Sequence, residues 1–401
     1  MKIRSITCFF HPDKVDDYTL ENLAAKADKL GQAFKQGGWE VQSRRMATVP
    51  FGQYTTPENA VERITVLEKK AAALGFDYLS VGPARMQDTQ DYLLIPDILA
   101  ATKNVFATGV LSHPHRGVSV EAVQACARII TQVAPLTPDG FTNLRFCAMS
   151  GVEPFTPFFP AAYSYGAGAA FSVAIECADA AVEAFKHAKS VAGGKAKLLE
   201  TLNSAARDLQ AIIYEAHLQW EMPFKGFDFS LAPFPEDWCS LAGAMETLGV
   251  ARIGLMGSLS AAAILAETLD RGEWRHVGFN GLMLPVLEDS VLAQRSTEGT
   301  YAVKDLLMYS AVCGTGLDTV PLPGDTSEEA IAALLMDVAA LSLRLRKPLT
   351  ARLMPVPGMK AGEMTAYDFA FFRNGKILDF PAEKLGGALA DSEWIEIGSR
   401  G

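Results

Sequence analysis

The chain has 401 residues, of which 49% are hydrophobic and 20% are charged, a composition typical of a folded globular protein with a sizeable core. Its 36 Lys and Arg residues against 46 Asp and Glu residues give a net charge of −10, which repels phosphate backbones and anionic lipid surfaces. We therefore expect neither nucleic acid nor a membrane as a partner. The length allows two domains or one large α/β barrel.

The cysteines and the N-terminus favour a cytoplasmic location. The cysteines are scattered, with no Cys-x-x-Cys pair and no zinc-finger spacing: Cys8, Cys126, Cys147, Cys177, Cys239 and Cys313. The N-terminus turns polar within about ten residues, too early for a signal peptide, and no later stretch offers the ~18 apolar residues of a membrane helix. We also expect a homo-oligomer, because symmetric dimers are the commonest state of soluble proteins.

Short apolar runs alternate with segments of helical periodicity in the first half of the chain, which is typical of a mostly parallel sheet covered by helices. The expected strands lie near Ile3–Phe9, Trp39–Met46, Tyr78–Val81, Val105–Leu111 and Leu144–Met149. The expected helices lie near Leu20–Gln36, Pro57–Leu74, Asp91–Thr102 and Ser119–Val133.

The segment 151–167 connects the two halves and is rich in proline and aromatic residues. A flexible linker would be polar, so this segment is predicted to be a buried or site-covering connection inside one domain, 1–401. The halves are about 1–150 and 168–358, followed by a C-terminal extension, 359–401.

The second half repeats the alternation. Strands are expected near Ala170–Glu176, Phe227–Leu231, Phe279–Pro285, Leu317–Pro321 and Thr350–Pro355. Helices are expected near Asp179–Ala192, Lys197–Trp220, Ser240–Leu248, Ser258–Thr268, Ala302–Val312 and Ser327–Arg344. Each half thus contributes about five strands.

The strongest local constellation runs from Cys313 through Gly-Thr-Gly-Leu to Asp318 and on to the Pro-Gly-Asp turn at Asp325. Two glycines release the backbone between a helix and a short strand, so the Cys313 thiol and the Asp318 carboxylate are candidates for one catalytic site. The alternative for Cys313 is a small buried apolar residue. Asp325 is a candidate substrate-binding residue, but Asp325 or Thr326 also suits the N-cap of the next helix.

Asp228 and Ser230 stand two residues apart on a predicted strand and therefore on the same face. A charged residue within a central strand needs a partner or a metal, so Asp228 is a candidate catalytic base or, together with Asp318, a ligand of a divalent metal ion. Ser230 is a candidate substrate-binding residue. The alternative for Asp228 is a buried carboxylate tied to an arginine or to backbone amides.

Two further residues are candidates for holding an anionic substrate. His113 follows the fourth strand in Ser-His-Pro-His-Arg-Gly, a pattern that suits a ligand site and equally a plain proline turn. Arg352 lies in the last core strand and can grip a carboxylate or pair with an acid within the fold. The Gly-Ala-Gly run at 166–168 precedes a strand rather than following one, so no nicotinamide or flavin cofactor is expected.

Several of these stretches resemble a family known as domain of unknown function 711. The resemblance rests on Ile3-Arg-Ser-Ile-Thr, Gly75-Phe-Asp-Tyr-Leu, Phe227-Asp-Phe-Ser-Leu-Ala-Pro, the run Val312–Thr326 and Arg352-Leu-Met-Pro-Val-Pro-Gly. It implies an α/β barrel of the pyruvate formate-lyase-like type, with ten strands in two five-stranded halves, related also to anaerobic ribonucleotide reductase.

The relatives of known chemistry in that fold use a glycyl radical near the C-terminus and a cysteine on a loop inside the barrel. The segment Ile377–Gly401 offers Gly386, Gly387 and Gly398 but no Arg-Val-x-Gly-Tyr pattern, so the sequence does not support glycyl radical chemistry. Cys313 matches the uncharacterised family rather than the radical enzymes, and it is not carried over as a radical position.

Two functions follow from these residues. The first is a non-radical enzyme, a hydrolase or lyase with or without a metal, that acts on a small polar metabolite in the barrel mouth through Asp228, Asp318 and Cys313. The second is a regulatory protein that binds a metabolite or a metal ion without turnover. Both make a small molecule the expected partner.

Overall fold

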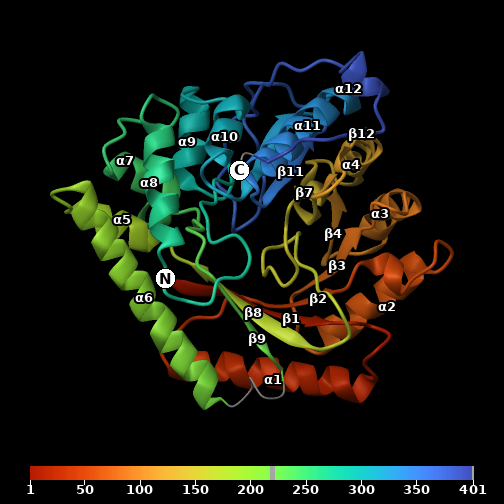
Figure 1. Ribbon diagram of the computed structural model, residues 1–401, viewed down its shortest axis with the longest axis horizontal. Helices are drawn as coiled ribbons and strands as arrows, with labels where there is room; N and C mark the ends of the chain where they lie inside the picture. Colours follow the sequence, from red (N-terminus) through yellow and green to blue (C-terminus); the bar gives the residue numbers. More distant parts are fainter. Residues whose placement is uncertain (217–221, 400–401) are drawn as a thin grey trace.

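The computed structural model describes residues 1–216 and 222–399. In these residues the chain forms a mixed α/β protein with a nine-stranded sheet and a separate three-stranded sheet. The strand order in the large sheet is β10-β11-β7-β4-β3-β2-β1-β8-β9. Helices surround the strands in the view of Figure 1.

The first half forms five adjacent parallel strands, as predicted. They are β1 (Lys2–Phe10), β2 (Arg44–Thr48), β3 (Tyr78–Ala84), β4 (Val105–Val110) and β7 (Phe146–Ser150). The predicted helices between them are confirmed as α1 (Asp17–Gln36), α2 (Ala60–Ala73), α3 (Gln90–Ala101) and α4 (Val120–Val133). The predicted start of the second strand at Trp39 is five residues early, because only an isolated bridge from Val41 to Ile3 precedes Arg44.

The second half runs antiparallel to the first where β8 meets β1 and where β11 meets β7. Its strands are β8 (Ala170–Glu176), β9 (Phe224–Asp228), β10 (Gly316–Pro323) and β11 (Leu349–Val356). Its helices are α5 (Ala178–Lys186), α6 (Val191–Glu215), α7 (Leu241–Thr247), α8 (Ser258–Asp270), α9 (Ser290–Glu298), α10 (Val303–Ser310) and α11 (Glu328–Leu345). The predicted helix end at Trp220 lies outside the described residues.

The predicted strand Phe279–Pro285 is not a continuous strand. Asn280 has a φ of 42°, outside the extended region, which interrupts regular pairing. The segment instead makes isolated bridges, with Leu282 bridging both Leu231 and Gly314, and Pro285 bridging Asp318. It therefore lies between the two edge strands of the nine-stranded sheet, β9 and β10.

The remaining elements are short. The small sheet consists of β5 (Ser112–His113), β6 (Gly117–Ser119) and β12 (Trp394–Ile395), and α12 (Ala388–Asp391) precedes its last strand. The described residues also form the 3-10 helices η1 (Phe51–Gln53), η2 (Ala134–Leu136), η3 (Phe141–Arg145) and η5 (Asp237–Cys239). Within the described parts of the chain, we find no helix with the length and apolar character that crossing a membrane requires.

The connection 151–167 packs against the face of the sheet opposite the helices. Hydroxyls from two strands bind its carbonyls: Ser80 Oγ donates to Ala162 O at 2.6 Å, and Thr108 Oγ1 donates to Pro160 O at 2.8 Å. The Phe159 ring meets Phe106 of β4 edge to face at 5.3 Å. The strands are consequently buried on both faces, which explains their nearly continuous apolar runs.

Candidate functional site

A cavity of about 290 Å³ lies where the N-terminal ends of the first-half strands meet the second half of the sheet. Its charged lining comes from six elements or loops: Arg4 in β1, Arg45 in β2, Asp77 before β3, Glu176 at the end of β8, Glu288 before α9 and Arg352 in β11. Ionisable side chains that converge in a concave space are the usual mark of a ligand site.

Four side chains form a buried chain of alternating charge beside the cavity. Arg352 Nε donates to Asp318 Oδ1 at 2.5 Å, and its Nη2 donates to Glu288 Oε1 at 2.9 Å. Arg4 Nη2 donates to the second oxygen of Glu288 at 2.8 Å. Arg352 and Asp318 are only 4% and 1% exposed. The guanidinium of Arg352 therefore has a carboxylate partner on each side. This agrees with the second of its two predicted roles, pairing with an acid within the fold.

The backbone of β10 sets this network in place. Burial raises the pKa of Asp318, and Arg352 opposes that shift. Thr319 follows with a φ of 40°, uncommon for a β-branched residue, and the pairing with β11 shifts register at this point. Val286 N donates to Asp318 O at 3.1 Å, and Leu287 N donates to Thr319 Oγ1 at 3.4 Å. The irregular strand therefore holds the segment that carries Glu288.

Arg45 stands apart from this network. Its Nε donates to Ser43 Oγ at 2.9 Å, and its guanidinium lies over the rings of Phe159 and Tyr78 at 5.1 and 5.7 Å. Among the residues that the structure describes, no carboxylate forms an ion pair with it. Burial, together with the positive charge of Arg4, lowers the pKa of Arg45 to about 9. Tyr78, Glu288 and Asp77 counter that shift, and the group still carries its charge at neutral pH.

Glu176 is a buried carboxyl group that lines the cavity and has no ion pair among the described residues. It is 3% exposed, and Gln42 Nε2 donates to its Oε2 at 2.7 Å. Burial raises the pKa of Glu176, while Arg4, the bond from Gln42 and Lys2 act in the opposite direction. A buried carboxyl group with a raised pKa that lines a cavity is a candidate for proton transfer.

Aromatic side chains cover the cavity on the side of the C-terminal extension. Phe369 and Phe371 line it, with ring centroids 5.3 Å apart, and Phe371 meets Phe234 edge to face at 6.0 Å. Phe371 is 40% exposed and so lies at the boundary with solvent. The three rings, named here the aromatic roof, provide an apolar surface opposite the charged groups.

Asp228 does not reach the cavity. Its carboxylate accepts hydrogen bonds from the backbone amides of Ser230, Phe279 and Asn280 at 2.9 to 3.1 Å, and from the Ser230 hydroxyl at 2.5 Å. Ser230 Oγ in turn accepts from Gly281 N at 3.1 Å. Burial raises the pKa of Asp228, and these bonds counter the shift. Asp228 and Ser230 thus fix the segment 279–281. For Asp228 this agrees with the alternative prediction, a buried carboxylate tied to backbone amides.

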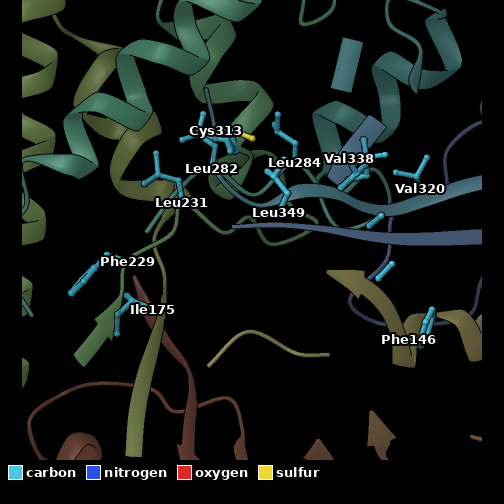
Figure 2. Close-up of a cluster of buried hydrophobic side chains, with 14 of the residues drawn as sticks. Phe146, Ile175, Phe229, Leu231, Leu282, Leu284, Cys313, Val320, Val338 and Leu349 are labelled. Atoms are coloured by element: carbon cyan, nitrogen blue, oxygen red, sulfur yellow. The ribbon is translucent and has the colours of Figure 1, made fainter. Parts of the chain in front are cut away.

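The remaining predicted residues are also elsewhere. Cys313 is buried among apolar side chains, and Figure 2 shows it beside Leu282 and Leu284. His113 lies exposed on the β5–β6 hairpin, where its Nδ1 accepts from His115 N at 3.2 Å. Asp325 is exposed in the turn before α11, whose N-cap is Ser327 and neither Asp325 nor Thr326, because the Ser327 hydroxyl accepts from Ala330 N.

The residues proposed as metal ligands do not fit that role. The oxygens of Asp228 face hydrogen-bond donors, and Asp318 is bonded to Arg352, so the two carboxylates share no partner. In the described ranges, no group of three or more His, Cys, Asp and Glu side chains is placed to hold a metal ion. Of the residues predicted for the site, the structure brings only Arg352 into the cavity, with Asp318 directly behind it.

Sequence reasoning missed Arg4, Arg45, Glu176 and Glu288. The first three lie within or at the end of predicted strands, so the argument that a charged residue in a buried strand needs a partner or a function applied to them as much as to Asp228. Glu288 lies in a stretch where no element was predicted, and the sequence carries no comparable signal for it.

Comparisons with known proteins support the resemblance seen in the sequence. The family described as "Uncharacterised ACR (DUF711)" matches residues 1–370. A UPF0210 protein of Oleidesulfovibrio alaskensis is 28% identical over 411 residues, covering 97% of this chain and 88% of that protein. A UPF0210 protein of Pyrobaculum aerophilum is 33% identical over 258 residues, covering 62% of this chain and 56% of that protein.

The chain therefore belongs to the DUF711 family. Among solved structures, the anaerobic ribonucleotide reductase from Thermotoga maritima with dATP in the specificity site matches 88% of this chain and 75% of the reductase chain, with 7% identity and a TM-score of 0.33. A second structure of that enzyme, in complex with dATP and CTP, matches with 8% identity and a TM-score of 0.31.

Proposed function

We propose that this member of the DUF711 family is a non-radical enzyme, a hydrolase or lyase, that acts on a small anionic metabolite in the cavity beside Arg45. The observation that carries the proposal is the guanidinium of Arg45, which lines the cavity and has no carboxylate partner in the described part of the chain. Arg45 is half-buried, so its charge is only partly hydrated, and a carboxylate or phosphate of a ligand would supply the ion-pair partner that it lacks among the described residues.

Each charged group receives one role in this proposal. Arg45 binds the anionic group of the substrate, and Arg4 adds positive charge on the same side. Glu176 gives or takes the proton, because its buried carboxyl group has a raised pKa and forms no ion pair with any described residue. Asp318, Arg352 and Glu288 hold Arg4 in position through their mutual ion pairs.

We also propose that the segment 279–285 completes the sheet as a tenth strand, giving the ten-stranded α/β barrel with two five-stranded halves. The bridges of Leu282 to Leu231 on one side and to Gly314 on the other support this closure. The cavity would then lie in one mouth of the barrel. Hydrogen exchange tests the closure: protection of the Leu282 and Val286 amides at the level of β10 supports it, and exchange at the rate of an open loop contradicts it.

A binding screen tests the function. Wild-type protein and Arg45→Gln are compared by thermal shift against small carboxylates and phosphates, with Arg271→Gln as control, since the Arg271 side chain is 62% exposed and pairs with Glu267 on the surface. Losing a charge-assisted bond is expected to weaken binding by about 10- to 100-fold in Arg45→Gln alone. A screen in which no ligand depends on Arg45 would overturn the proposal.

Turnover is then followed by NMR with each ligand that binds. We expect wild-type protein to convert one of them, and Glu176→Gln to convert it at least about 100-fold more slowly at a saturating ligand concentration. A ligand that depends on Arg45 and is never consumed would support the regulatory alternative instead.

A further inference from the structure

We infer that the ligand of the cavity is an amino-carboxylate with a large apolar or aromatic group, which places its carboxylate on Arg45, its ammonium near Glu176 and its apolar part under the aromatic roof. The inference rests on the proposed function, because it names the substrate class of the same site. Three features of the cavity carry it.

The first feature is the charge left uncompensated after all ion pairs are formed. Asp318, Arg352, Glu288 and Arg4 satisfy one another in an unbroken chain. Arg45 has only a serine hydroxyl as polar partner, and a glutamine amide is the one hydrogen-bond donor to a Glu176 side-chain oxygen among the described residues. Asp77, the other acid without an ion pair in this lining, is exposed and accepts from Arg44 N at 2.8 Å. One cation and one buried acid therefore remain for the ligand.

The second feature is the separation of these two groups on different strands. Arg45 is the second residue of β2 and Glu176 is the last residue of β8, and β1 lies between these strands in the sheet. A simple carboxylate on Arg45 would leave Glu176 with the charges of Arg4 and Lys2 nearby but with no ion pair among the described residues. A molecule that bears a positive group as well as a negative one satisfies both Arg45 and Glu176. Pairing charged side chains that are shielded from water favours binding.

The third feature is the apolar surface. The rings of the aromatic roof, Phe234, Phe369 and Phe371, line the same cavity of about 290 Å³ as the charged groups. That volume lies at the lower end of the roughly 300–1,000 Å³ typical of small-molecule sites. It suits a molecule of amino-acid size with one large apolar side chain, and it leaves little room for a nucleotide.

Paired ligands test the inference by isothermal titration calorimetry. The probes are leucine, phenylalanine and tryptophan, each beside the acid of the same skeleton that lacks the amino group. With wild-type protein we expect at least one amino acid to bind at least about tenfold more tightly than its deaminated partner. This comparison needs no variant and so stands even where a substitution prevents folding.

Variants then assign the groups. Glu176→Gln is expected to remove the preference for the amino acid while leaving the affinity for the deaminated acid within about twofold, and Arg45→Gln to weaken both. Glu200→Gln serves as the matched control, since the Glu200 side chain is 71% exposed. We expect it to change neither affinity.

The outcomes separate this inference from the proposed function. Deaminated acids that bind as tightly as the amino acids, with affinities that depend on Arg45, would overturn the inference and leave the anion site in place. An amino-acid preference that persists in Glu176→Gln would also overturn it. Binding of neither set, with no effect of Arg45→Gln, would count against both.

Discussion

Arg352 provides the sharpest test of the buried charge network. The substitution Arg352→Met keeps most of the side-chain volume and removes the only cation that contacts both Asp318 and Glu288 among the described residues. Two buried carboxylates then face each other with Arg4 as the remaining partner. Breaking a buried ion pair from one side costs about 3–5 kcal/mol, and we expect a loss of that size in the free energy of unfolding, measured in urea at pH 7.

The pH dependence of this loss gives a second readout. In the variant the two carboxylates repel each other, which raises their pKa values in the folded state above those in the unfolded chain. The folded variant then binds protons more tightly than the unfolded chain, so its stability recovers as the pH falls toward the ordinary range of about 4. The difference from wild type should therefore shrink between pH 7 and pH 5.

The control is Arg128→Met. Arg128 pairs with Glu328 at 3.1 Å on the surface, with side chains 46% and 34% exposed, and such pairs contribute about 0–1 kcal/mol. Adding Asp318→Asn to Arg352→Met removes one of the stranded charges and should restore part of the stability. A loss in Arg352→Met no larger than that of the control, or one that grows as the pH falls, would refute the reasoning.

Three further predictions follow from buried groups. Burial raises the pKa of Glu176, so its contribution to stability is greatest below the unfolded pKa of about 4.3 and declines as the pH rises through the folded pKa. Glu176→Gln should therefore be more stable than wild type at pH 7 and lose that gain at pH 4. An equal difference in stability at both pH values would contradict this. Gly278 has a φ of 75°, and a Cβ there would lie 2.4 Å from Asp228 Oδ2. Gly278→Ala should therefore lower the free energy of unfolding by at least about 1–3 kcal/mol. The control Gly386→Ala should not, because no atom lies within 4 Å of a Cβ at that position. All six cysteines are free and buried, so Ellman's reagent should titrate six thiols in urea and none rapidly in the native protein. If one thiol of the native protein reacts rapidly and that reaction is absent in Cys313→Ala, Cys313 is accessible and the prediction is wrong.

The sequence predicted most of the elements because their periodicity is strong. Continuous apolar runs between turns mark strands buried on both faces, and these coincide with β1, β3, β4, β7 and β8 within three residues at each end. Helix α9 was missed because Ser290–Glu298 is short and largely polar, with no clear apolar stripe. Its start depends on the Asp289 side chain, which accepts from Leu292 N at 3.0 Å.

The site was harder to predict because local sequence does not give the partner of a charged residue. Asp228 and Asp318 both lie in buried strands, but one meets three backbone amides and the other an arginine. Arg45 and Arg352 look equally plausible as anion-binding residues. Only the tertiary structure shows that Arg352 has carboxylates on both sides and that Arg45 has none among the described residues.

The position of the cavity follows from how the inner face of the sheet is divided. Alternate residues of a strand share a face, so Arg45 and Ala47 point the same way, as do the pairs Tyr78 and Ser80, and Phe106 and Thr108. The first residue of each pair lines the cavity, and the second contacts the connection 151–167. The connection is therefore the floor of the cavity, to which it contributes Phe159 under Arg45. The same proline- and aromatic-rich segment that joins the two halves thus limits the depth of the site and places the ring of Phe159 5.1 Å from the guanidinium of Arg45.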